Sequence, residues 1–211
     1  MTDPGPVARA AEIAGLAHHG PLGPDEVAHV VEATHDPDPR VRAAALGALA
    51  RGVDTGIALA PWLTAMTDDA VAVRLRAAEL GATFGADCVP ALVHALDDDD
   101  VTVVEAAAWS LGELREPAIE DPDAVLTLAR AATDHHDALA REAAVATLGA
   151  LGDPRGLSAI LRATEDKPAV RRRAVLALAP FEGDDVDAAL QRALADRDWQ
   201  VRQAAEDLRD A

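Results

Sequence analysis

Residues 41–49, Val-Arg-Ala-Ala-Ala-Leu-Gly-Ala-Leu, contain a phrase that appears six times along the chain. Its general form is Val-Arg-x-x-Ala-Ala-x-x-Leu, with acidic residues just before it. A fixed period of this size is the sequence signature of stacked supersecondary units. The repeat therefore predicts the architecture, but it does not name a partner. The copies begin at Val41, Val73, Val103, Ala140, Val170 and Val201, at intervals, by subtraction, of 32, 30, 37, 30 and 31 residues.

The spacing within the phrase predicts a helix. If its first residue is position 0, positions 0, 4, 5 and 8 fall on one stripe of a helix with about 3.6 residues per turn. Another apolar helix precedes each copy, and a turn such as His-Asp-Pro-Asp-Pro at 35–39 separates the two helices. No alternating strand pattern is present. First helices are expected near 25–34, 56–66, 87–96, 122–132, 155–164 and 185–195, and second helices near 40–50, 70–84, 100–114, 137–150, 168–180 and 198–209.

The repeat runs through nearly all 211 residues, so the sequence predicts one elongated domain. The stretch 7–16 resembles a lone second helix and is expected to form a degenerate cap, since terminal repeats are usually atypical. The segment 115–122 explains the longest interval as an exposed loop, because it contains proline and charge. The predicted domain 1–211 has a cap at 1–22 and repeats at 23–53, 54–85, 86–116, 117–153, 154–183 and 184–211.

Composition excludes several classes of protein. The chain has 37 acidic and 19 basic residues, a net charge of −18, which argues against a nucleic-acid partner because phosphate contacts require clustered Lys and Arg. No apolar run reaches the ~18 residues that span a bilayer, and the N-terminus lacks the features of a signal peptide. We therefore predict a cytoplasmic protein with no membrane partner. The single cysteine, Cys88, excludes an internal disulfide and a cysteine-based zinc site.

The acidic excess has two open interpretations. Lys167 is the only lysine, and a scarcity of Lys, Asn and Tyr fits a GC-rich genome. The same pattern also fits a halophile, whose proteins use net charge to stay soluble.

The repeated phrase resembles the HEAT repeat, in the short form found in phycobilin lyase-like proteins. The resemblance covers roughly residues 25–211 and implies an all-α fold. Its expected form is a right-handed α-α superhelix, a HEAT-repeat solenoid of about six helical hairpins plus an N-terminal capping helix. It rests on Val-Arg-x-x-Ala at 41–45, 73–77, 170–174 and 201–205, on Ala-Arg-x-x-Ala at 140–144, and on the endings Leu-Gly-Glu-Leu at 111–114 and Leu-Gly-Ala-Leu-Gly-Asp at 148–153.

The resemblance also implies two structural features. The arginine of each phrase is expected to pair with acids of the turns and to form a ladder between repeats, and the second helices are expected to line the concave side. The third repeat departs from the pattern, because Val104 stands in place of the arginine. The ladder is therefore expected to have a gap in its middle.

The turns and the histidines give candidate binding groups with simpler structural explanations. Acidic residues before each phrase suit helix capping. The run 97–100, four consecutive aspartates, is the best candidate for an acidic ridge that binds cations or a basic partner. His135 and His136 are adjacent and so do not share a helix face, and no histidine is followed by glutamate. We predict no metal site and no cofactor.

The three tryptophans carry different expectations. Trp199 is expected to seal the last layer, and Trp62 to pack between repeats. Trp109 occupies position 6 of its phrase, where the other copies hold unrelated residues. An aromatic side chain there either packs against neighbours or anchors a partner, since exposed tryptophan is enriched at binding hot spots.

The sequence offers little catalytic chemistry. Cys88 lies near a helix start, where a thiol pKa can fall, but no histidine pairs with it. We therefore predict a monomeric, non-catalytic scaffold or adaptor that binds another protein on its concave face. A phycobilin lyase-like or other small-molecule-binding role is the alternative, and a purely structural subunit is a third possibility. The residues predicted to contact the partner are Leu75, Glu79, Glu105, Trp109, Glu142 and Arg172.

Overall fold

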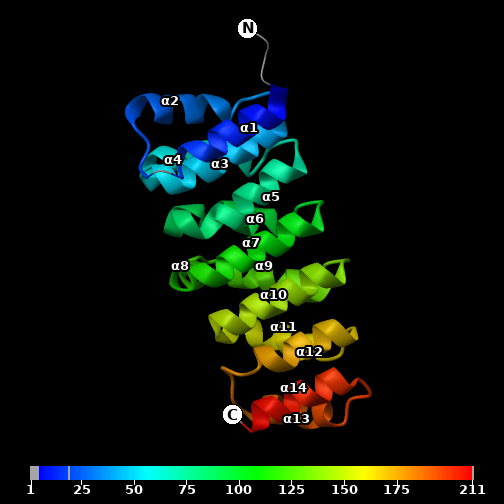
Figure 1. The fold of residues 1–211 in the computed structure, drawn as a ribbon. Coiled ribbons are helices and arrows are strands. Elements are labelled where there is room, and N and C mark those ends of the chain that lie inside the picture. Colours follow the sequence, from blue (N-terminus) through cyan, green and yellow to red (C-terminus); the bar gives the residue numbers. More distant parts are fainter. Residues whose placement is uncertain (1–4, 19, 211) are drawn as a thin grey trace. The chain divides into compact units, whose positions relative to one another are not determined.

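The computed structural model describes residues 5–18 and 20–210, and every regular element in these residues is a helix. The predicted all-α repeat fold is confirmed (Figure 1). Residues 1–4, His19 and Ala211 lie outside the described residues. Residues 1–4 belong to the N-terminal stretch in which the sequence predicts no signal peptide. The chain divides into two compact units, Met1–Ala91 and Leu92–Ala211. Each unit is described by itself.

The first unit consists of two hairpins and a lone helix. Helices α1, α3 and α5 pack in one layer, with α2 and α4 against α3. Helix α1, the predicted cap, therefore packs in the position of a second helix, as the sequence indicates. The bounds are α1 Gly5–Leu16, α2 Pro24–Ala33, α3 Pro39–Gly52, α4 Thr55–Ala65, α5 Val71–Leu80 and the 3₁₀ helix η1 Gly81–Cys88; α6, Val89–Ala95, spans the boundary between the units.

The second unit has two layers. Helices α7, α10, α12 and α14 pack side by side and form the second-helix layer, and α9, α11 and α13 form the other layer. The bounds are α7 Val101–Leu114, α8 Glu116–Glu120, α9 Ala124–Asp134, α10 Ala138–Leu151, η2 Pro154–Gly156, α11 Leu157–Ala163, α12 Pro168–Ala177, α13 Asp184–Leu194 and α14 Trp199–Arg209.

The predicted apolar stripe is the core. In α7, the residues at positions 0, 4, 5 and 8 of the phrase are fully buried, and the equivalent residues of α10 are at most 1% exposed. Most of them are alanine and valine, so the helices approach closely and bury a continuous surface between neighbouring repeats. These positions are Val103, Ala107, Ala108 and Leu111 in α7, and Ala140, Ala144, Val145 and Leu148 in α10.

Two predicted segments differ from the structure. The helix expected at 70–84 ends at Leu80 and continues as η1, in which Gly85 has a φ of 68°. A positive φ favours glycine and interrupts a right-handed helix. The loop expected at 115–122 contains the short helix α8, whose Ala118 is buried. Ala118, beside Pro117, packs into the core, whereas the charged residues of the segment had suggested an exposed loop.

Candidate functional site

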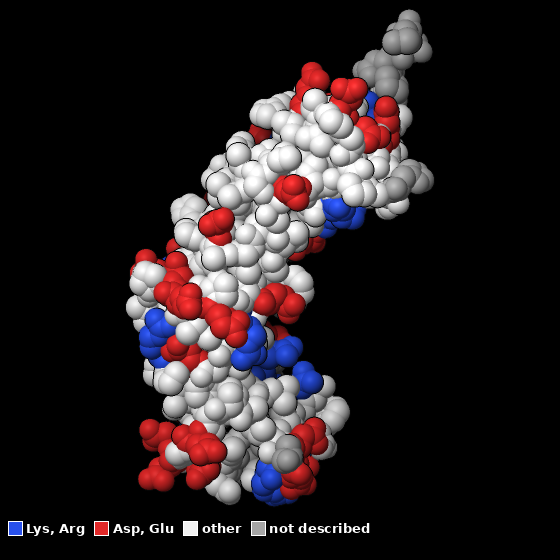
Figure 2. Space-filling view, turned by 90° about the vertical axis from the view of Figure 1, so that its left-hand side faces the viewer, with Lys and Arg blue, Asp and Glu red and all other residues white. Residues whose placement is uncertain are grey.

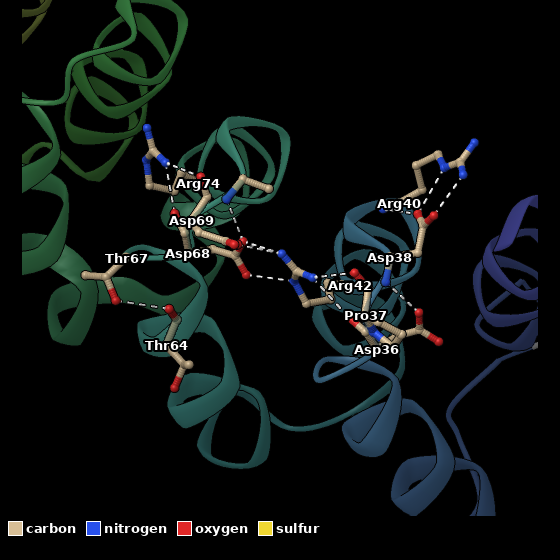
Figure 3. A network of polar contacts seen from close by, with 11 residues as sticks. Asp36, Pro37, Asp38, Arg40, Arg42, Thr64, Thr67, Asp68, Asp69 and Arg74 are labelled. Atoms are coloured by element: carbon tan, nitrogen blue, oxygen red, sulfur yellow. Dashed lines mark hydrogen bonds and ion pairs between the residues drawn. The ribbon is translucent and has the colours of Figure 1, made fainter.

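An arginine links neighbouring repeats of the first unit. Arg42 donates from Nη1 to the backbone oxygen of Asp36 at 3.0 Å, within its own repeat. It also donates to both carboxylate oxygens of Asp68 in the next turn, at 2.6 and 2.8 Å (Figure 3). Both side chains are 14% exposed. A bidentate guanidinium–carboxylate pair fixes geometry as well as charge. The arginine of the phrase therefore sets the position of one repeat on the next.

The same rung recurs in the second unit. Arg141 binds Asp166 at 2.6 and 2.8 Å, and Arg171 binds Asp196 at 2.7 and 2.9 Å. Each arginine also donates to a backbone oxygen of its own turn. The ladder that the family resemblance implies is therefore present. Arg9, in the first unit, makes the equivalent pair with Asp36 at 3.1 Å.

The gap at Val104 has a matching change in the following turn. Where other repeats have the ladder aspartate, the turn before α10 has His135, whose Nδ1 accepts from the Asp137 backbone N–H at 3.1 Å. Val104 itself is fully buried. A lone aspartate facing a valine would be a half-buried charge without a partner, so the two replacements are consistent.

Other contacts join the third and fourth repeats across this gap. Arg130 pairs with Asp97 at 2.7 Å, and the buried hydroxyl of Thr147 donates to the Ala108 backbone oxygen at 2.8 Å. The ion pair is about half exposed at both ends. This layer therefore depends more on packing than its neighbours do.

The ladder makes stability depend on pH. The pKa of Asp196 lies below its ordinary value because Arg171 donates hydrogen bonds to its carboxylate. Such a group contributes stability above its unfolded pKa of about 3.9, and this contribution is lost as pH falls through the folded value. We expect Asp196→Asn to lower the melting midpoint at pH 7, with a gap from wild type that narrows below about pH 4. Circular dichroism melts at pH 7, 5, 4 and 3 measure this gap, and an equal gap at pH 3 and pH 7 would contradict it.

Most of the four-aspartate run serves the fold. Asp100 caps α7 by accepting from the Thr102 N–H, and Asp98 accepts from the Asp100 N–H, each at 2.9 Å. Asp97 pairs with Arg130. Asp99 is exposed and makes no side-chain hydrogen bond or ion pair within the described residues. A turn hydrogen bond, a helix cap and an ion pair therefore account for Asp98, Asp100 and Asp97. The cation-binding ridge stays a prediction.

No metal centre is visible in the described part of the chain, where no group of three or more His, Cys, Asp or Glu side chains is placed to hold an ion. His135 and His136 stack with their ring centroids 4.5 Å apart. No helix among the described residues is both long and apolar enough to cross a membrane.

Cys88 is unsuited to nucleophilic chemistry. Its side chain is fully buried, and its Sγ donates to the backbone oxygens of Gly81 at 3.0 Å and Gly85 at 2.9 Å. Burial raises the pKa of the thiol to about 11. The helix start that suggested a lowered pKa is therefore outweighed by desolvation.

We expect the native thiol to resist modification. At pH 8, Cys88 should react with a disulfide reagent such as DTNB at least about 100-fold more slowly in buffer than in 8 M urea, because both the thiolate fraction and access are low. Absorbance at 412 nm measures the released thiolate, and Cys88→Ala supplies the blank. Fast native labelling would show that the thiol is accessible.

The tryptophans differ sharply in exposure. Trp62 is buried, but its Nε1 donates to the Ala77 backbone oxygen at 2.7 Å and its ring packs on Phe84, so these contacts lie within its own repeat and not between repeats as predicted. Trp199 is 65% exposed, so the prediction that it seals the last layer is wrong. It lies at the first turn of α14, beyond the buried stripe that starts at Val201. Trp109 is 57% exposed in the middle of α7.

The six predicted contact residues fall in both units. Leu75 and Glu79 lie on α5 of the first unit, where Glu79 pairs with Arg76 at 2.9 Å. The other four lie on the second-helix layer of the second unit: Glu105 and Trp109 on α7, Glu142 on α10 and Arg172 on α12. Glu105 and Glu142 are half-buried, whereas Trp109 and Arg172 are exposed.

Glu105 and Trp109 share the solvent stripe of α7, since they are one turn apart. Burial raises the pKa of Glu105, and the charges of Asp137 and Glu142 raise it further. Figure 2 shows acidic side chains in several clusters on the side of the molecule turned to the viewer, with basic side chains gathered in fewer places. A half-buried carboxyl beside Asp137 and Glu142, as Glu105 is, favours a cation. We call Glu105, Trp109, Glu113 and Glu142 the Trp109 face.

Sequence reasoning missed two cavities in the first unit. One, of about 410 Å³, lies among α2, α3 and α4, where Val31, Ile57 and Pro61 line it. The other, of about 480 Å³, lies against α1, α2 and the turn before α3, and includes His29 and Glu32. The small residues Ala60 and Ala65 of α4, which line the first cavity, were the sequence signal for it.

The hairpins, with their two layers and arginine ladder, define a helical-repeat protein of the α-solenoid class. A family model for HEAT repeats matches residues 59–121 and 118–179, more than half of the chain, and the PBS lyase HEAT-like repeat matches residues 170–196. The chain belongs to the HEAT-repeat family.

Solved structures show the same fold. YibA of E. coli is 16% identical, with a TM-score of 0.63 over 99% of this chain and 89% of that one. The CpcE–CpcF complex of phycocyanin lyase from Nostoc sp. is 22% identical, with a TM-score of 0.60 over 97% of this chain and 79% of that one. An engineered protein is 18% identical, with a TM-score of 0.61 over 88% and 97%. At these identities the likeness concerns the fold alone. No curated protein matches the chain significantly.

Proposed function

We propose that this HEAT-repeat protein is a non-catalytic scaffold that binds a protein partner through the Trp109 face. The observation that supports this most is the exposure of Trp109, 57%, in the middle of a helix whose other large apolar residues are buried or, at Val101, half-buried. Exposed tryptophan is costly to solvate and is enriched among residues that dominate binding energy. The buried thiol at Cys88 and the structural use of the turn carboxylates leave little chemistry for catalysis.

A pair of tryptophan variants tests the proposal. We expect Trp109→Ala to weaken binding of a partner recovered from the native host at least about 10-fold, since a hot-spot residue contributes ~2 kcal/mol or more. Its melting temperature should stay near that of wild type. Trp199→Ala is the matched control, because Trp199 is also exposed on a second helix of the same unit. Equal binding by the two variants, or unfolding of Trp109→Ala, would remove the anchor from the proposal.

A second candidate is a phycobilin lyase-like or other small-molecule-binding role. The match of residues 170–196 to the PBS lyase HEAT-like repeat favours it, and the cavity of about 480 Å³ is within the usual size range of ligand sites. Titration with a linear tetrapyrrole, followed by visible absorbance, distinguishes the candidates. A saturable spectral change supports the second candidate, and an unchanged spectrum opposes it.

The monomeric state and the cytoplasmic location stay part of the proposal, as does the salt adaptation suggested by the net charge of −18. If the acidic excess is an adaptation to salt, the melting midpoint should rise between 0.1 and 2 M KCl, because screening weakens the repulsion among the carboxylates. Size-exclusion chromatography with light scattering at both salt concentrations measures the oligomeric state. A midpoint that falls with KCl would contradict the salt interpretation.

A further inference from the structure

Glu105 is a carboxyl without a cation. It is half-buried on α7, and no ion pair to it is present among the described residues. The nearby charges that act on it, Asp137 and Glu142, are both negative. Burial among like charges raises its pKa, which means that the ionised form lacks compensation. A positive group brought to this position would relieve both costs.

Glu142, on the adjacent helix α10, is only partly compensated. Its Oε1 lies 3.4 Å from Nη2 of Arg173, a long contact for an ion pair. The Nε atom of the same arginine is buried and has no hydrogen-bond partner. Arg173 lies on α12, and Arg172 of the same helix is exposed. The carboxylates of Glu105 on α7 and Glu142 on α10 therefore lack full compensation by positive charge.

Trp109 supplies the apolar part of this surface. It follows Glu105 by four residues and precedes Glu113 by four, so all three lie on one stripe of α7. On the adjacent α10, the half-buried residues one and two turns beyond Glu142 are small, namely Ala146 and Gly149. Small side chains there leave the indole open, consistent with its 57% exposure. A flexible cationic side chain can lie across an indole and still reach carboxylates at its rim.

We infer that the Trp109 face binds an Arg or Lys side chain from a basic segment of the partner protein, with its stem across the Trp109 indole and its charged head at Glu105 and Glu142. This inference rests on the proposed function. The face of an indole attracts a cationic side chain, and the two carboxylates add charge-assisted contacts. An apolar segment would bury Glu105 further without compensation, and an acidic segment would meet three carboxylates. Both are therefore disfavoured.

A labelled basic peptide tests the inference. We would use fluorescence anisotropy at 0.15 M KCl with a 12-residue peptide of alternating Arg and Ser, together with its Glu-for-Arg counterpart. Wild type should bind the basic peptide and not the acidic one. Trp109→Ala, and separately the double variant Glu105→Gln with Glu142→Gln, should each raise the Kd at least about 10-fold.

Matched controls separate a specific site from general attraction to an acidic protein. The double variant Asp184→Asn with Asp185→Asn also removes two negative charges, but from exposed residues of α13. Trp199→Ala removes the other exposed tryptophan. Both controls should change the Kd less than 2-fold. If all charge-neutralised variants weaken binding equally, or if wild type does not bind at 1 mM peptide, the inference is wrong.

Stability gives an independent readout. Glu105→Gln should raise the melting midpoint, because it removes a repelled carboxylate, and a lower midpoint would contradict the absence of a cation partner. With a native partner in hand, the failures are distinct. Loss of binding in Trp109→Ala but not in the double glutamine variant overturns the inference alone. Full binding by both variants overturns the proposed function as well.

Discussion

Replacing Asp166 with alanine is expected to lower the free energy of unfolding by about 3 kcal/mol. The carboxylate accepts from Nε and Nη2 of Arg141 at 2.6 and 2.8 Å, and the two side chains are only 19% and 11% exposed. The variant leaves a nearly buried guanidinium without its counter-charge at the joint between the fourth and fifth repeats. Urea unfolding followed by circular dichroism measures the change.

Asp134→Ala is the control for this prediction. Asp134 is the last residue of α9, just before the preceding turn, and also pairs with an arginine, Arg162, but at 3.5 Å and with side chains 59% and 68% exposed. Exposed pairs contribute less than about 1 kcal/mol. If the two aspartate variants lose the same free energy, the arginine ladder does not hold the repeats together as the structure indicates.

Gly149→Ala should cost about 1–3 kcal/mol of unfolding free energy through overpacking. A Cβ on Gly149 would lie 2.6 Å from both Cα and Cβ of Ala177, and 3.1 Å from its backbone oxygen. The obstacle is partly backbone, so α10 and α12 must separate to admit one methyl group. Chemical denaturation measures the loss, and a variant as stable as wild type would show that this contact is loose.

Gly112→Ala is the matched control, since Gly112 stands at position 9 of its phrase, as Gly149 does. A Cβ there would meet Thr147 Cγ2 at 3.6 Å, an ordinary contact. Alanine is a better helix former than glycine by up to about 1 kcal/mol, so this variant should be as stable as wild type or more stable. A large loss would contradict the open contact between Gly112 of α7 and Thr147 of α10.

The helical repeats could be predicted from sequence because similar residues recur at the buried positions of all six copies. Val103, Ala107 and Leu111 are buried as the spacing requires, and Arg141 meets Asp166 as the family pattern implies. A period repeated in every copy averages out local exceptions.

The exceptions depend on tertiary surroundings that a single sequence does not encode. Trp199 starts its helix ahead of the buried stripe and stays exposed, although its size suggested a sealing role. Trp62 finds its hydrogen-bond acceptor within its own hairpin. Glu105 could be placed on the correct helix, but its lack of a cation became visible only from the charges on α10. Val104 replaces the ladder arginine, and His135 replaces the ladder aspartate of the following turn. A comparison of all six turns would have found this matched replacement in the sequence.

The proposed binding face can be tested most directly through the indole N–H groups. The chain has 3 tryptophans, so a ¹H–¹⁵N spectrum should contain three indole signals, and Trp109→Phe assigns one of them. On titration with the basic peptide, we expect the Trp109 signal to shift and saturate while those of Trp62 and Trp199 stay in place. A Trp109 signal that does not move, while backbone amides elsewhere report saturable binding, would contradict the assignment of this face.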